Sequence, residues 1–125
     1  MNATEQTIAA LFDRWNESLQ TGDPKKVVAN YAERSILLPT VSNTPRLTPA
    51  EKEDYFTHFL QSKPSGVINL RQIDISGDMA VDSGVYTYAM AAKGQTVEAR
   101  YSFVYKWDGE QWLIISHHSS GMPEG

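Results

Sequence analysis

Residues 113–120 read LIISHHSS and place two adjacent histidines before two serines. Imidazole and hydroxyl groups clustered in this way can ligate a metal, transfer a proton or line a binding pocket. If the stretch is a strand, successive side chains point to opposite faces, so His117 and His118 cannot ligate the same ion. The third histidine, His58, is expected on a helix surface, and zinc or iron sites need three or four converging ligands. The sequence therefore predicts no metal site and no cofactor.

The hairpin before this strand determines which histidine joins the polar residues of the preceding strand. A DGE turn at 108–110 separates the strand that contains Arg100 from the strand that contains His117. Asp-Gly favours a two-residue connection, and with two or four residues Arg100, His117 and Ser119 share one face. An odd connection would place His118 on that face instead. The sequence thus predicts an arginine, a histidine and a serine on the same side of the sheet.

An arginine in mid-strand among apolar neighbours needs a partner if it is buried. One interpretation is a structural ion pair between Arg100 and Glu98 or a helix carboxylate. The other is a cavity in which the guanidinium holds an anionic or carbonyl ligand. His117 is the best candidate for a catalytic group. The candidate ligand-binding residues are Trp15, Tyr55, Tyr86, Arg100, His117 and Ser119.

Three helices are expected to precede most of the strands. The first begins at a cap, Asn2 or Thr4, and carries apolar residues at helical spacing along one face. The second begins at Asp23 within TGDPKKVVANYA, and the third begins at Thr48 within TPAEKEDYFTHFLQ. SILLP, between them, is typical of a short strand. The apolar face of the first helix consists of Ile8, Leu11, Phe12, Trp15 and Leu19.

The chain turns to β-structure from Gly66 onward. Four segments rich in β-branched and aromatic residues are separated by short turn signals, which makes neighbouring strands antiparallel. Helices followed by such a meander indicate an α+β fold, in which a curved antiparallel sheet wraps around the helices and leaves a cavity between them. The four segments are VINLRQIDIS, MAVDSGVYTYAMAA, TVEARYSFVYKW and QWLIISHHSS.

The start of the last strand is apolar on both faces, and such a strand needs cover on both sides. Helices can cover one face, so we expect a second copy of the chain on the other, in a homodimer or higher oligomer. The alternative is cover by a loop or the C-terminal tail. The residues predicted at the interface between copies are Tyr105, Trp107, Trp112 and His118.

Composition narrows the class of protein. The 125 residues are expected to form a single domain over 1–125, and the net charge of −4 argues against a nucleic-acid or anionic-membrane surface. There is no cysteine, and the N-terminal stretch lacks the features of a signal peptide. We therefore expect a cytoplasmic protein without disulfides.

Several stretches resemble the association domain of calcium/calmodulin-dependent protein kinase II and its free-standing bacterial relatives, in the nuclear-transport-factor-2-like (cystatin-like, SnoaL-like) superfamily. They are Trp15 with TGDP at 21–24, LLPTVSN at 37–43, YFTHFL at 55–60, DSGVYTY at 82–88, ARYSFVY at 99–105 and WLIISHHSSGMP at 112–123. The resemblance implies a sheet wrapped on a long N-terminal helix, self-association through the sheet and a deep pocket. In the kinase domain arginines line that pocket. Arg100 matches one of them, but Ser119 and Tyr86 stand near the others, so a less cationic pocket is implied.

Three functions follow from these observations. The first is a self-associating module that binds a small anionic or carbonyl ligand. The second is an enzyme of the SnoaL or ketosteroid-isomerase type, with His117 as acid or base and an oxyanion held by Tyr55, Tyr86 or Arg100. The third is a pure oligomerisation domain. The chain has no glycine-rich phosphate loop and no HRD or DFG motif, so kinase activity is not expected.

Overall fold

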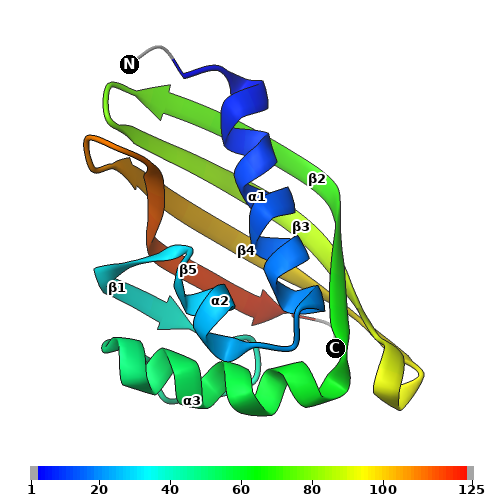
Figure 1. The fold of residues 1–125 in the computed structure, drawn as a ribbon. Helices are drawn as coiled ribbons and strands as arrows, with labels where there is room; N and C mark the ends of the chain where they lie inside the picture. The colour runs from blue at the N-terminus through cyan, green and yellow to red at the C-terminus, as the bar shows by residue number, and fades with distance from the viewer. Residues whose placement is uncertain (1–2, 124–125) are drawn as a thin grey trace.

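The computed structural model describes residues 3–123, and its elements follow the expected order of helices and then a meander (Figure 1). The helices are α1 (Glu5–Gln20), α2 (Pro24–Val28) and α3 (Pro49–Phe59). The strands are β1 (Tyr31–Leu38), β2 (Pro64–Ser76), β3 (Met79–Met90), β4 (Gln95–Trp107) and β5 (Trp112–Gly121). Short 3₁₀ turns at Leu60–Ser62 and Ala91–Lys93 complete the set. The α+β fold class is confirmed.

The five strands form one curved sheet in the order β1-β5-β4-β3-β2. The last four make the expected antiparallel meander, whereas β1 pairs with β5 in parallel. Helix α1 lies across one face, here called the concave face, and α3 runs beneath the β1–β5 side (Figure 1). The opposite face, here called the convex face, carries none of the helices of residues 3–123.

Helix α1 buries the predicted apolar face against the sheet. Its five apolar residues are all buried, and Thr4 caps the helix by accepting a hydrogen bond from the backbone of Thr7. Asn2, the other candidate cap, lies outside the described residues. The rings of Phe12 and Trp15 pack against Phe103 of β4 with centroids 6.2 and 5.7 Å away. This contact holds the helix over the centre of the concave face.

The second helix is shorter than the sequence predicts. We expected it to include NYA, but α2 ends at Val28 and β1 begins at Tyr31. The backbone N–H of Ile114 donates to the carbonyl of Asn30, and Tyr31 pairs with Ile114. Pairing with β5 therefore takes these residues out of the helix, a tertiary effect that local propensity cannot report.

A β-bulge changes the face alternation at the start of β5. The connection between β4 and β5 has the expected even length, with Trp107 paired to Trp112 and Tyr105 to Ile114. One extra residue in β5 then shifts the register, so that Val104 pairs with Ser116. From this point on, every β5 side chain faces the side opposite to that of an unbroken ladder.

The predicted interface residues divide between the two faces. Tyr105 and Trp112 are buried on the concave face, and Trp107 packs against Trp112 with ring centroids 5.9 Å apart. Tyr105 and Trp112 therefore cannot form the outer surface that the sequence suggested, because the face they share is the one that α1 covers. Only His118 of the four is exposed on the convex face. None of the helices within residues 3–123 is long and apolar enough to cross a bilayer.

Candidate functional site

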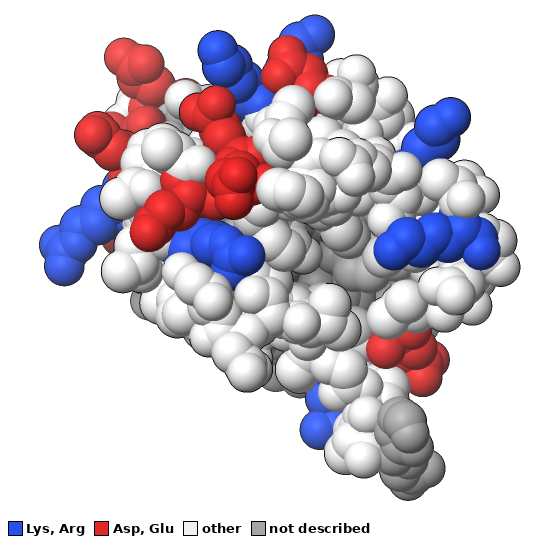
Figure 2. Space-filling view, turned by 90° about the horizontal axis from the view of Figure 1, so that it is seen from below, with Lys and Arg blue, Asp and Glu red and all other residues white. Residues whose placement is uncertain are grey.

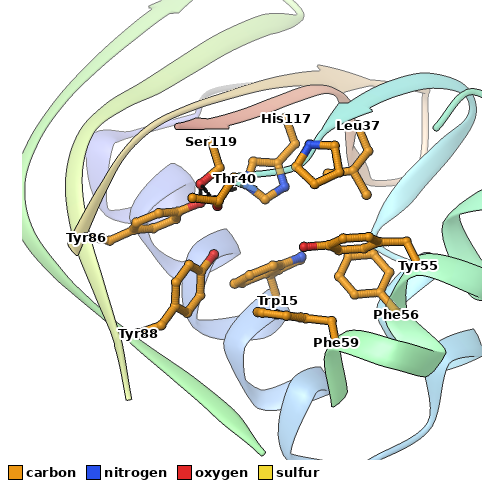
Figure 3. A pocket seen from close by; sticks show the side chains of 11 residues that line it. Trp15, Leu37, Thr40, Tyr55, Phe56, Phe59, Tyr86, Tyr88, His117 and Ser119 are labelled. Atoms are coloured by element: carbon orange, nitrogen blue, oxygen red, sulfur yellow. Dashed lines mark hydrogen bonds between the residues drawn. The ribbon is translucent and has the colours of Figure 1, made fainter. Parts of the chain in front are cut away.

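A narrow hollow lies between the concave face of the sheet and helices α1 and α3 (Figure 3). The centre of a water molecule has about 10 Å³ of free space in it, which is roughly the room for one water. Aromatic rings make most of its wall. The side chains of Thr40, Ser119 and His117 lie together at one end, and the hydroxyls of Tyr55 and Tyr88 also face the hollow (Figure 3). The lining residues are Trp15, Leu37, Pro39, Thr40, Tyr55, Phe56, Phe59, Tyr86, Tyr88, His117 and Ser119. We call this hollow the inner chamber.

His117 is buried in the wall of the inner chamber, with 3% of its surface exposed. Its ring stacks on Phe103 with centroids 4.0 Å apart and meets Trp15 edge-on at 5.4 Å. Burial lowers the pKa of His117 to about 3, with a smaller contribution from repulsion by His118. The imidazole is therefore neutral at physiological pH.

Hydroxyl groups occupy both nitrogens of His117. The Tyr31 hydroxyl lies 2.7 Å from Nδ1, and the Tyr86 hydroxyl lies 3.2 Å from Nε2. Tyr86 donates to Ser119 Oγ at 2.7 Å, and Ser119 Oγ lies 2.5 Å from Thr40 Oγ1. Burial raises the pKa values of Tyr31 and Tyr86, so both phenols stay protonated. We call Thr40, Tyr86, His117 and Ser119 the hydroxyl–imidazole cluster.

A wider hollow, the outer chamber, adjoins the inner one and shares Thr40, Tyr55, Phe59 and Tyr88 with it. Its volume is about 270 Å³. Its remaining lining residues are Val41, His58, Ser62, Met90, Lys93 and Val97. Figure 2 views the protein from the α3 side. It shows a central hollow among uncharged side chains, and most of the acidic side chains in this view lie to one side of the hollow.

Tyr55 stands between the two chambers. Burial raises its pKa to about 12, while the guanidinium of Arg46 lies over its ring, 5.2 Å from the centroid, and opposes that shift. The phenol is therefore neutral and closes the aromatic wall. Lys93 is the one permanently charged side chain that lines either chamber within residues 3–123.

The structure places Arg100 away from the other candidate residues. It brings Trp15, Tyr55, Tyr86, His117 and Ser119 together around the inner chamber. Arg100 pairs with Ser120 in the ladder and is exposed on the convex face. The predicted grouping of Arg100 with His117 is wrong because the bulge in β5 reverses the parity between the two strands. A buried arginine is thus not part of this site.

Sequence reasoning did not identify Tyr31 or Thr40. Tyr31 begins β1 and Thr40 follows its end, and both reach the cluster because β1 lies parallel to β5. A parallel partner strand cannot be inferred from turn lengths. Apart from the polar side chain of Thr40, nothing in the sequence therefore marked Tyr31 or Thr40 as site residues. Within residues 3–123, no three histidine, cysteine, aspartate or glutamate side chains converge as a metal site would require.

Comparison with known proteins identifies the family. The profile of the calcium/calmodulin-dependent protein kinase II association domain matches residues 4–123. A solved structure from Xanthomonas campestris, assigned to the same association domain, is 48% identical over 99% of this chain and 91% of its own, with a TM-score of 0.93. Comparison with curated proteins found no match.

Two solved structures of lower identity share the fold. One is the iota-carbonic anhydrase from a cyanobacterium in complex with bicarbonate, 20% identical over 98% of this chain and 94% of its own, with a TM-score of 0.85. The other is a protein from Streptomyces avermitilis assigned as a dehydratase of the NTF2-like family, 11% identical over 94% of each chain, with a TM-score of 0.77. This chain belongs to the calcium/calmodulin-dependent protein kinase II association domain family, within the NTF2-like, cystatin-like fold.

Proposed function

We propose that the protein is a self-associating module that binds a small molecule through a carbonyl or carboxylate oxygen at the hydroxyl–imidazole cluster. One observation carries the proposal. Side chains from β3, β5 and the segment after β1 converge on a hollow the size of one water, and a neutral imidazole and three hydroxyls line its polar end. Sites of this kind are mostly apolar, with a few placed polar groups that fix ligand orientation.

The two chambers suit two parts of one ligand. The inner chamber has room for about one heavy atom, such as a carbonyl oxygen, while the outer chamber of about 270 Å³ can hold the rest of the ligand. That volume is near the lower end for small-molecule sites, which start at roughly 300 Å³. The ligand is therefore a compact molecule that places its oxygen against Thr40 and Ser119.

The charges favour a particular kind of head group. None of the side chains of residues 3–123 that line the inner chamber carries a permanent charge, and burying an unpaired anion there is costly. A neutral carbonyl oxygen meets hydroxyl donors without that cost. Lys93, at the outer chamber, can pair with an anionic group at the other end of the ligand. A short keto acid combines both features.

Binding can be tested by calorimetry with four probes: acetone, formate, 4-oxopentanoate and bicarbonate, the last because a relative of this fold binds it. We expect 4-oxopentanoate to bind most tightly, and Ser119→Ala to weaken it about tenfold or more by removing a hydroxyl of the cluster. Ser120→Ala is the matched control, since Ser120 faces the convex side. Equal affinities for the two variants, or no binding by any probe, would refute the proposal.

Lys93 provides a second comparison within the same experiment. If the lysine pairs with the ligand's carboxylate, Lys93→Met weakens 4-oxopentanoate and leaves acetone unchanged. If both probes lose affinity equally, the lysine acts on the fold and not on the ligand. Lys63→Met, at an exposed lysine outside both chamber linings, controls for net charge.

Self-association is the second half of the proposal, and it rests on the family and on the convex face. That face carries partly exposed apolar side chains and two more exposed ones, Val67 at 62% and Leu70 at 65%. The partly exposed ones are Val81, Val85, Val104, Leu113 and Ile115. Adjoining apolar side chains that no helix covers are typical of a surface between subunits.

Light scattering should give a mass above one chain, and Val104→Asp should lower it, whereas Val41→Asp in an exposed loop should not.

Acid–base catalysis is the alternative that the neutral histidine and its hydroxyls leave open. A group with a pKa of about 3 is a weak general base at neutral pH, which favours binding over catalysis. Measuring CO₂ hydration separates the two. A rate above the buffer background that Tyr86→Phe abolishes would support an enzyme, and a rate equal to background would support the binding module.

A further inference from the structure

We infer that Trp15 and Tyr31 hold His117 in the neutral form that carries its proton on Nε2, so that the hydrogen-bond chain ends with Thr40 as a donor to the ligand. The inference rests on the proposed function for the ligand and deepens it. It assigns positioning roles to two residues that do not touch the ligand oxygen. It also defines the ligand class as one that presents a hydrogen-bond acceptor and no donor.

The donor-to-acceptor order of the hydrogen-bond chain is set at the indole of Trp15. An indole N–H can donate but cannot accept, and Nε1 of Trp15 lies 3.2 Å from the Tyr31 oxygen. The Tyr31 oxygen is therefore an acceptor toward Trp15. Its own proton is left for its other polar neighbour, Nδ1 of His117, at 2.7 Å. Nδ1 then accepts, and a neutral imidazole must carry its proton on Nε2.

The opposite tautomer leaves a buried group without a partner. If Nδ1 of His117 carried the proton, Trp15 and His117 would both donate to the Tyr31 oxygen. The proton of Tyr31 would then have no acceptor among the side chains of residues 3–123, in a side chain that is almost fully buried. An unsatisfied buried donor disfavours this tautomer by roughly tenfold to a hundredfold.

The same direction continues to the ligand side of the cluster (Figure 3). Nε2–H of His117 donates to the Tyr86 oxygen at 3.2 Å, and Tyr86 donates to Ser119 at 2.7 Å. Because Ser119 accepts from Tyr86, we assign its own proton to Thr40, whose Oγ1 lies 2.5 Å away. The Thr40 hydroxyl proton has no acceptor among the described side chains, and Thr40 lines both chambers. A carbonyl or carboxylate oxygen can accept a hydrogen bond from this donor. An ammonium group cannot, because it has donors only.

The side chains around His117 favour a neutral imidazole. Trp15 of α1, Tyr31 of β1, Tyr86 of β3 and Phe103 of β4 face the imidazole, and none carries a formal charge at neutral pH. His118, the nearest titratable neighbour along β5, points to the convex face. Among the described residues, no carboxylate therefore faces the ring to draw a second proton onto it.

Nitrogen-15 NMR of histidine-labelled protein tests the tautomer directly. The signals of His117 are assigned by their loss in His117→Gln. We expect Nε2 to show the shift of a protonated nitrogen and Nδ1 that of an unprotonated one. Tyr31→Phe and Trp15→Phe should both move the Nδ1 signal toward a mixture of tautomers, because each removes a donor from the fixed end of the chain.

Tyr105→Phe is the matched control, since its buried hydroxyl has no hydrogen-bond partner among the described residues. This variant should keep the wild-type imidazole signals. A protonated Nδ1 in the wild-type protein would overturn the inference. Unchanged signals in Tyr31→Phe, with circular dichroism showing a folded protein, would also overturn it.

Affinity for 4-oxopentanoate tests the ligand end separately. Thr40→Val removes the donor and should weaken binding about tenfold or more, while Thr40→Ser should restore it. Propylammonium, which presents only donors, should bind neither variant nor the wild type. If 4-oxopentanoate binds and Thr40→Val has no effect, the role of Thr40 is refuted while the proposed function stands. If no probe binds, the proposed function and the role of Thr40 fail together, and the NMR result decides the tautomer independently.

Discussion

Two buried polar clusters lie on the concave face, and they differ in how their hydrogen bonds are completed. Asp82, which has no exposed surface, accepts hydrogen bonds from Arg71 and Tyr101, each at 2.7 Å. Four residues further along β3, Tyr86 enters the hydroxyl–imidazole cluster, which holds no permanent charge and borders a hollow. The first cluster is completed by its own partners, whereas the second ends in a hydroxyl beside open space. A buried polar cluster whose hydrogen bonds are all completed points to a structural role, whereas one that ends in a hydroxyl beside a hollow is a candidate binding site.

The largest expected effect comes from opening the closed cluster. Arg71→Met leaves the Asp82 carboxylate buried with Tyr101 as its remaining partner. Removing one member of a buried pair costs about 3–5 kcal/mol, and the lower end applies here because Arg71 is partly exposed. Urea denaturation should show this loss. An unchanged free energy of unfolding would mean that the ion pair contributes nothing to the fold.

Acid should affect the open cluster next most strongly, through His117. The folded protein holds the pKa of His117 near 3, below the unfolded value near 6.5, so between these pH values the unfolded chain binds more protons. The contribution of His117 to stability is therefore complete above about pH 6.5 and falls as the pH drops toward 3. The difference in unfolding free energy between wild type and His117→Gln should shrink by roughly 1–2 kcal/mol from pH 7 to pH 5. His118→Gln, on the convex face, should leave the slope unchanged.

Tyr86→Phe should affect binding more than stability. The change removes the hydroxyl that joins His117 to Ser119 and costs about 1 kcal/mol of unfolding free energy. Affinity for 4-oxopentanoate should fall about tenfold or more, since the cluster loses the group that orients Ser119. Tyr101→Phe, in the closed cluster, should lower stability and leave affinity unchanged. If both variants lose affinity equally, the two clusters do not differ in their role in ligand binding.

The smallest expected effect belongs to Arg100. This side chain is exposed on the convex face and pairs in the ladder with Ser120, so Arg100→Ala should change stability by less than about 0.5 kcal/mol. Affinity for the four probes should also stay the same, as measured by calorimetry. Loss of binding in this variant would restore the arginine pocket that the sequence suggested.

The fold was predictable because its signals are local. The apolar face of α1 and the capping box of Thr48 and Glu51 appear in the structure where the spacing of residues placed them. The antiparallel meander follows from short turns. Each of these features depends on residues close together in the chain.

The composition of the site was only partly predictable, because it depends on two non-local features. One extra residue in β5 moves Arg100 to the opposite face from His117, and no glycine marks that bulge in WLIIS. The parallel pairing of β1 with β5 brings in Tyr31 and Thr40, and turn chemistry contains no information on it. A single register shift is a small change in energy, but it reverses the face of every side chain beyond it.

The most direct test of the open cluster is a titration of histidine-labelled protein with 4-oxopentanoate, followed by nitrogen-15 NMR. His117 and His118 are adjacent in sequence and face opposite sides of the sheet, so each reports on one face. We expect the imidazole signals of His117 to shift in a saturable way while those of His118 stay constant. Saturable shifts at His118 alone would contradict the account and place the ligand on the convex face.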